Sequence, residues 1–451
     1  MSRCRRRLNL GGTVGVDQGR IQRMNHESRM ESIEAYLERK YREIGLINDS
    51  LREPRQLSRP RSVEEVIAAK FQLTAALRAD HELQDWNATE TAWSAAARPK
   101  SGQFVFRYDY QRADLHVSGP SFYGLECDRA RETIYTSSGM AAISALLLAS
   151  LPIFARADVL ALPGSYGETL ELVERFVPNR QIVSLALPLP DSLGRGDAPR
   201  IFLLDSCVSA RAFESVLHCD GSALDLLMFD TTCFSGSSGR IRRVLRWARR
   251  YRIPTVLVRS HNKLDTLGSE YGRLGSAVFV DWQEARADSN PSVLERLAEE
   301  TRNAVRLLGS AALPAHFPPY VGSKKYWALT RGRIAAILCN SRFATRRFAR
   351  ELPILAAELH FVHGLYVTLR SRRPLDEVDA RRVAEAMSGE LRKTYPIRHA
   401  GSFGFDFAAT EWFHDATSEQ YSVRVAVPDL PTALWNDLVT AIGKWWVQNN
   451  R

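Results

Sequence analysis

Short apolar runs alternate with helix-like runs between residues 134 and 282, and this alternation restricts the possible folds more than any other feature. One helix-like run, residues 241–251, places Ile241, Val244 and Leu245 on one face. Fully apolar strands separated by helices are typical of a mostly parallel sheet with both faces covered. The sequence therefore predicts an α/β domain. Its strand-like runs are residues 159–162, 182–187, 201–204, 226–229, 255–258 and 277–280.

The segments on either side have different patterns. Residues 30–90 have helical periodicity, and residues 283–350 are mainly helical with a proline-rich break at 314–319. Beyond them, strand-like and helix-like segments alternate irregularly, which indicates an α+β unit. We predict three parts: an N-terminal extension and helical arm (1–115), a large α/β domain (116–324) and a small α+β domain (325–451).

Composition excludes several classes of protein. With 45% hydrophobic and 25% charged residues among 451, the chain has an ordinary globular composition. No apolar run approaches the roughly 20 residues that span a membrane. The net charge of +10 suggests nucleic-acid binding, but the basic residues are dispersed apart from Arg3–Arg7 and the helix near residues 240–252. We therefore expect neither a nucleic-acid nor a membrane partner.

The cysteines and the N-terminus indicate the compartment. Six cysteines form no C-x-x-C pair and have no zinc-like spacing to histidine, so free thiols in a reducing compartment are expected. The N-terminus is rich in arginine but lacks the apolar core of a signal peptide. We therefore expect a cytoplasmic protein. Two alternatives concern the basic N-terminal segment: it is a transit peptide, or the true start codon is that of Met24 or Met30.

Two sites at helix starts could carry chemistry. Ser138, Gly139 and Met140 lie where a strand ending at Tyr135 turns into a helix, and such a turn offers free N–H groups to an anion such as phosphate. An ordinary helix cap would look the same. Tyr166 begins the following helix after a strand, so its ring is expected at the same edge of the sheet, for binding or simply for packing.

An aspartate and a lysine follow two neighbouring apolar strands. Asp230 ends one strand and Lys263 comes shortly after the next, in a chain with eight lysines. Ligands of open α/β sheets bind at the carboxyl ends of the strands. A carboxylate for a pyridinium nitrogen and an amine for a Schiff base are what pyridoxal 5'-phosphate (PLP) requires. The pair therefore predicts a PLP site.

The order of these motifs resembles the Cys/Met-metabolism family of PLP-dependent enzymes, which includes cystathionine γ-synthase, cystathionine γ-lyase and methionine γ-lyase. The resemblance covers about residues 100–430 and implies the aspartate-aminotransferase-like fold, known as fold-type I. The matching stretches are Tyr110-Gln111-Arg112, Ser138 to Ile143, Tyr166 to Thr169, Asp230-Thr231-Thr232, Ser260 to Lys263, and Tyr421 to Val427 preceded by Ser402-Phe403-Gly404.

The resemblance implies a role for each residue. Lys263 would hold PLP and move protons, Asp230 would keep the ring nitrogen protonated, and Tyr166 would stack on the ring and assist proton transfer. Phosphate would be held by Ser138, Gly139, Met140, Ser260 and Asn262, and by Tyr110 and Arg112 from the neighbouring subunit of a homodimer that further assembles into a tetramer. Arg424, Ser402 and Glu168 would bind the amino-acid substrate, with Arg424 on its α-carboxylate.

Departures from the family pattern affect the expected reaction. Asn262 replaces a threonine, His261 is bulkier than usual, and Glu270 lies in a divergent G-S-E-Y stretch. Glu168 has three alternative roles: it recognises a polar or cationic side chain of the substrate, it assists departure of the leaving group, or it is a solvated carboxylate in the first turn of a helix. The leading prediction is a lyase that eliminates a γ or β substituent from an L-amino acid. The alternatives are a γ-replacement synthase, an aminotransferase or decarboxylase on the same fold, and a non-catalytic scaffold.

Overall fold

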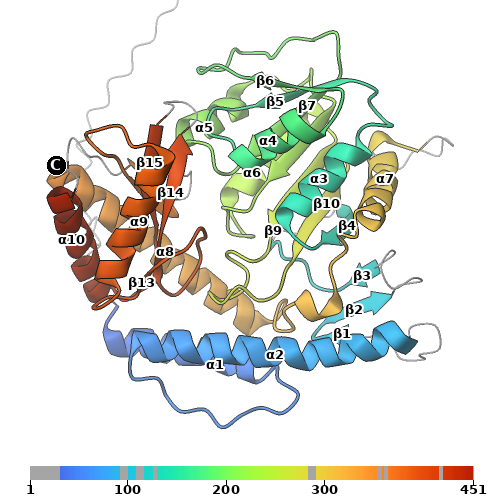
Figure 1. Cartoon of the computed structure of the whole chain (residues 1–451). Coiled ribbons are helices and arrows are strands. Elements are labelled where there is room, and N and C mark those ends of the chain that lie inside the picture. Colours follow the sequence, from blue (N-terminus) through green and yellow to red (C-terminus); the bar gives the residue numbers. More distant parts are fainter. Residues whose placement is uncertain are drawn as a thin grey trace, which may run out of the picture.

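The computed structural model describes residues 31–91, 100–107, 116–124, 130–282, 291–352, 358–359, 364–415 and 420–449. A seven-stranded sheet with helices on both faces occupies the centre, and a five-stranded sheet with its own helices lies beside it (Figure 1). Two long N-terminal helices run along one side of both units (Figure 1). No helix in the described ranges is both long enough and apolar enough to cross a bilayer.

The central sheet has the order β4-β10-β9-β8-β7-β5-β6. Strands β6, β5, β7, β8 and β9 pair in parallel, and β10 pairs antiparallel with both β9 and β4. The predicted mostly parallel α/β sheet is thus confirmed. Its strands are β4 (Ala130–Thr136), β5 (Ala157–Ala161), β6 (Arg180–Ser184), β7 (Arg200–Asp205), β8 (Leu226–Asp230), β9 (Thr255–Ser260) and β10 (Gly275–Val280).

Both faces of this sheet are buried, which explains why its strands are apolar throughout. In β7, Phe202 and Leu204 pack with α5 and α6, whereas Ile201 and Leu203 pack on the opposite face. Helices α3, α4 and α7 cover that second face. The helices are α3 (Gly139–Ala149), α4 (Gly167–Phe176), α5 (Ala210–His218), α6 (Gly239–Tyr251) and α7 (Val293–Leu307).

The C-terminal unit is the smaller α+β part that the sequence predicts. Its sheet has the order β11-β12-β15-β14-β13, with β13 and β14 parallel and the other pairs antiparallel. The elements are α8 (Lys324–Glu351), β11 (Glu358–Leu359), β12 (Tyr366–Leu369), α9 (Glu377–Leu391), β13 (Ile397–His399), β14 (Ala408–Asp415), β15 (Gln420–Ala426) and α10 (Thr432–Asn449). A short 3₁₀ turn, η1 (Pro314–His316), precedes α8.

The N-terminal helices are integral to the packing. Tyr36 of α1 is fully buried in the same apolar cluster as Ile337 and Phe348 of α8. Helix α2 also contacts η1. Apolar contacts therefore fix this segment against the C-terminal unit. The elements are α1 (Ile33–Asn48), α2 (Val63–Thr91) and a small sheet of β1 (Lys100–Ser101), β2 (Phe104–Arg107) and β3 (His116–Ser118).

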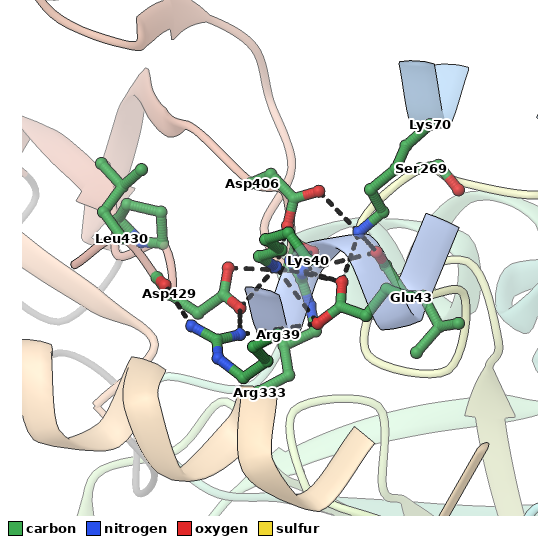
Figure 2. A network of polar contacts seen from close by, with 12 residues as sticks. Arg39, Lys40, Glu43, Lys70, Ser269, Arg333, Asp406, Asp429 and Leu430 are labelled. Carbon is green, nitrogen blue, oxygen red and sulfur yellow. Dashed lines mark hydrogen bonds and ion pairs between the residues drawn. The ribbon is translucent and has the colours of Figure 1, made fainter. Parts of the chain in front are cut away.

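A cluster of charged side chains is buried between these helices and the C-terminal unit (Figure 2). Lys40 Nζ lies 2.6 Å from both Asp406 Oδ1 and Asp429 Oδ2. Lys70 Nζ lies 2.6 Å from both Glu43 Oε2 and Asp406 Oδ2. We call the whole set the buried ionic cluster; it consists of Arg39, Lys40, Glu43, Lys70, Arg333, Asp406 and Asp429.

We expect Asp406→Ala to lower the free energy of unfolding by about 3–5 kcal/mol, because it leaves buried cations without their carboxylate. Burial alone would raise the pKa of Asp406, but Arg333, Lys40 and Lys70 hold it well below its usual value. Its contribution is therefore present above the unfolded pKa of about 4 and is lost as the pH falls through the lower folded pKa.

Urea denaturation at pH 7 measures this effect. The matched control is Glu214→Ala, which removes a carboxylate from an exposed pair with Arg243. The control should change stability by about 1 kcal/mol or less. Equal losses in the two variants would show that the cluster contributes no more than a surface ion pair.

Candidate functional site

A cavity of about 280 Å³ lies at the carboxyl ends of β7, β8 and β9, where the two units meet. Residues from both units line it, so neither unit alone forms this cavity. It brings together most of the predicted site residues: Ser138, Gly139, Met140, Tyr166, Asp230, Ser260, Asn262, Lys263 and Arg424. The other lining residues, which sequence reasoning did not select, are Ile143, Cys207, Thr232, Cys233, Tyr366, Gly401 and Phe403.

The N-terminus of α3 forms one wall of the cavity. Ser138 caps the helix, with its Oγ accepting a hydrogen bond from Ala141 N at 3.0 Å. Helix geometry leaves the N–H groups of Gly139 and Met140 without an intrahelical acceptor. A Cβ on Gly139 would lie 3.0 Å from Cβ of Ser260, so the close approach of β9 favours glycine there. This wall can bind an anion.

Polar side chains after β9 face the same region. Asn262 Oδ1 accepts a hydrogen bond from Leu274 N at 3.2 Å, so its amide nitrogen is the atom that can donate to a ligand. Ser260 N donates to Thr232 Oγ1 at 3.0 Å, which ties the end of β9 to the loop after β8. Asn262 thus supplies the kind of donor expected of the threonine that it replaces.

The amino group of Lys263 contacts side chains from two loops. Its Nζ donates to Ser402 Oγ at 2.5 Å, and Ser402 Oγ in turn donates to Glu270 Oε1 at 2.8 Å. Glu270 Oε1 lies 3.6 Å from Lys263 Nζ. The three side chains form a continuous chain of donors and acceptors that begins in the cavity.

Two carboxylates end adjacent strands. Asp205 and Asp230 are paired in register on β7 and β8. Asp205 accepts hydrogen bonds from Tyr166 N at 2.9 Å and Cys207 N at 2.7 Å, and Asp230 accepts one from Thr232 N at 2.7 Å. Burial, and then the charge of Asp205, raise the pKa of Asp230 to about 7. The hydrogen bonds with Thr232 and the charge of Arg259 lower this pKa but do not offset the effects that raise it.

Tyr166 and Glu168 lie at the start of α4. Tyr166 is the N-cap residue and is half-buried, while Glu168 is exposed in the first turn. Burial, and then the charge of Glu168, raise the pKa of Tyr166 above its usual value. The phenol is therefore protonated at neutral pH, and the structure leaves each of the alternative roles of Glu168 open.

Arg424 of β15 forms the opposite wall. Its Nε donates to Glu411 Oε1 at 2.6 Å, and its guanidinium lies 4.4 Å from the ring centroid of Tyr366 and 4.5 Å from that of Phe413. These contacts hold the guanidinium in a largely buried position at the cavity. Arginine in such a setting suits a planar anion such as a carboxylate.

Some predictions fall elsewhere. Tyr110 and Arg112 lie outside the described residues. His261 is buried away from the cavity lining: it stacks on Phe122 with 3.8 Å between ring centroids and hydrogen-bonds with Asp265 and Ser276. Its bulk therefore serves packing. Tyr366 and Phe403 gave no separate signal, because a buried aromatic side chain in a strand or loop is usually a core residue.

The sequence and structure were compared with known proteins. No protein-family model matches the sequence, and no curated protein matches it. A solved structure of cystathionine γ-synthase from Xanthomonas oryzae pv. oryzae, in complex with cystathionine, has 15% sequence identity and a TM-score of 0.48, and the match covers 82% of this chain and 98% of that one.

Two further structures are similar in layout. A methionine γ-lyase from Micromonospora echinospora has 18% identity and a TM-score of 0.46, with 69% of this chain and 81% of that one covered. An alanine aminotransferase from Pyrococcus furiosus has 11% identity and a TM-score of 0.46, with 70% and 76% covered.

Proposed function

We propose that this chain binds PLP through Lys263 and acts on an L-amino acid. One observation carries the proposal: Lys263, Asp230, Tyr166 and the N-terminus of α3 come from four separate parts of the chain and line one cavity of about 280 Å³. The motif resemblance implies the aspartate-aminotransferase-like fold, and that fold predicts that these residues meet in one cavity.

The chemistry of the lining residues fits the cofactor. The α3 N-terminus suits its phosphate, and the amine of Lys263 suits its aldehyde. A protonated ring nitrogen would add a positive charge beside Asp230, which would offset the burial and the charge of Asp205 that raise its pKa. When bound, PLP would supply an electron-withdrawing ring that stabilises negative charge at the substrate Cα.

The protein's own residues divide the remaining work. Arg424 would hold the substrate carboxylate with two parallel hydrogen bonds, and Lys263 would move protons between Cα, Cβ and the leaving group. Tyr166, protonated at neutral pH, would pack on the ring and donate a proton. Ser402 lies 2.5 Å from Lys263 Nζ and would orient it as well as contact the substrate.

We favour elimination of a γ or β substituent, with a thiolate, activated oxygen or halide as the leaving group. Replacement by an added nucleophile is the alternative, and transamination or decarboxylation are further ones. Glu168, exposed beside Tyr166, would then recognise a polar or cationic group at the distal end of the substrate or assist departure of the leaving group. We also propose a homodimer, further assembled into a tetramer, in which Tyr110 and Arg112 reach the phosphate of the neighbouring copy.

Reductive trapping tests cofactor binding. The protein is incubated with PLP and reduced with borohydride, and peptides are mapped by mass; the pyridoxyl group should be on Lys263. Unreduced protein is then incubated with γ- and β-substituted L-amino acids, with and without thiols. Keto acid and ammonia without a thiol would support elimination, and a thioether product would support replacement. Modification at a lysine other than Lys263 would contradict the proposal.

A further inference from the structure

We propose that Glu270 is a positioning residue for Lys263: it orients the amino group through Ser402, and its carboxylate is the counter-charge of the protonated amine. This inference rests on the proposed function for its importance, because Lys263 must carry a proton to act as an acid and lose it to act as a base.

The contacts define the arrangement. Ser402 Oγ is shared, accepting from Lys263 Nζ at 2.5 Å and donating to Glu270 Oε1 at 2.8 Å. Glu270 Oε1 is also 3.6 Å from Nζ, close enough for a direct ion pair. The Glu270 side chain is 37% exposed and that of Lys263 is 25% exposed, so the carboxylate connects the amine with solvent.

The backbone of Glu270 is strained, and strain of this kind clusters at functional sites. Glu270 has a φ of 46° and Leu267 a φ of 53°, in a region that favours glycine. Its side chain reaches Ser402 from this conformation.

The buried ionic cluster holds the two loops in place. Lys70 and Arg333 both donate to the carbonyl oxygen of Leu267, and Arg333 also donates to that of Gly404. Arg333 thus joins the loop that carries Glu270 to the loop that carries Ser402. The cluster, none of whose residues lines the cavity, therefore fixes the loops that carry the partners of Lys263.

Other titratable groups share the cavity with Lys263. They are Tyr166, Cys207, Asp230, Cys233, Tyr366 and Arg424. Asp230 is the one carboxylate among the described lining residues, and its expected partner is the ring nitrogen. Arg424 is paired with Glu411. Glu270 is therefore the carboxylate whose removal should affect the amine of Lys263 most.

Competitive labelling of the protein without added cofactor tests this inference. Lys263 is acetylated with acetic anhydride across a pH series, and its labelling is followed by peptide mass. In Glu270→Gln the labelling of Lys263 should be several-fold faster than in the wild type at each pH of the series, because the amine has lost the carboxylate 3.6 Å away with which it pairs. Glu171→Gln, which removes an exposed carboxylate from α4, should leave the rate of labelling unchanged.

Glu270→Asp keeps the charge and should recover most of the difference, which a purely structural effect would not do. It also serves if the glutamine variant fails to fold. Unchanged labelling in Glu270→Gln, or an equal change in Glu171→Gln, would overturn the inference. If the wild-type protein binds no PLP, yet Glu270→Gln still changes the labelling of Lys263 as predicted, the proposed function alone would be refuted.

Discussion

Lys263→Ala is expected to give a folded protein that develops no visible absorbance band with PLP and has no measurable turnover. The reason is chemical: no other described lysine lines the cavity. Lys40 and Lys70 are held in the buried ionic cluster, and Lys325 is on the surface, paired with Asp49 at 3.3 Å. None of these three amines can replace that of Lys263 without large movements.

Absorbance spectra recorded during titration with PLP measure the effect, and circular dichroism checks folding. Lys325→Ala removes an exposed lysine and is the matched control; its spectrum and turnover should equal those of the wild type. A visible band that survives in Lys263→Ala and maps to a different lysine would place the cofactor elsewhere.

Asp230→Asn should have opposite effects on activity and on the stability of the cofactor-free protein. Turnover should fall by about 10²–10³-fold, the size of the loss that follows removal of one preorganised electrostatic contact from a catalytic site. Without a charge to keep the ring nitrogen protonated, the ring withdraws electrons less strongly. Activity measured at saturating PLP and substrate separates this loss from weaker binding.

Stability should change in the other direction. Asp230 binds its proton more tightly in the folded protein, with a pKa of about 7, than in the unfolded chain, where it is about 4. Its contribution is thus fully present below about pH 4 and is lost as the pH rises through about 7. Above pH 7, cofactor-free Asp230→Asn should therefore be more stable than the wild type by roughly 1–4 kcal/mol.

Denaturation of the cofactor-free proteins at pH 5 and pH 8 tests the sign. Asp225→Asn is the control, because Asp225 is exposed at the opposite end of β8 and the amide can still accept the hydrogen bond from Arg200 N. A variant that is no more stable than the wild type at pH 8 would show that Asp230 is not strained by burial.

The sequence predicted the half of the site that is built on the central sheet. Asp230 and Lys263 follow apolar strands, and the carboxyl ends of such strands meet by geometry alone. The orientation of β10 could not be predicted, because an apolar run buried on both faces looks the same in either direction. Gly275 in β10 lies so close to α3 that a Cβ there would be 2.3 Å from the Ser138 carbonyl.

The other half of the site depended on motif resemblance. Arg424 and Ser402 were selected by their place in the family pattern, whereas Tyr366 and Glu411 were missed. Strand β14, which carries Glu411, also went unrecognised. Its contact with Arg424 arises only when β14 pairs with β15, and no local pattern encodes such a pairing.

The buried ionic cluster was invisible to sequence reasoning for a related reason. Lys40 and Glu43 have the spacing of an ordinary exposed helix pair, with Nζ and Oε2 3.1 Å apart. The carboxylates that make burial of Lys40 possible, Asp406 and Asp429, are 366 and 389 residues further along the chain. Separation along the chain conceals the arrangement completely.

That separation has a consequence for synthesis on the ribosome. Helices α1 and α2 emerge well before Arg333, Asp406 and Asp429, which neutralise their buried charges and lie in the last third of the sequence. Until then, docking would bury unpaired charges at a cost of several kcal/mol. Helices α1 and α2 must therefore wait until Asp429 has been synthesised before they reach their final positions.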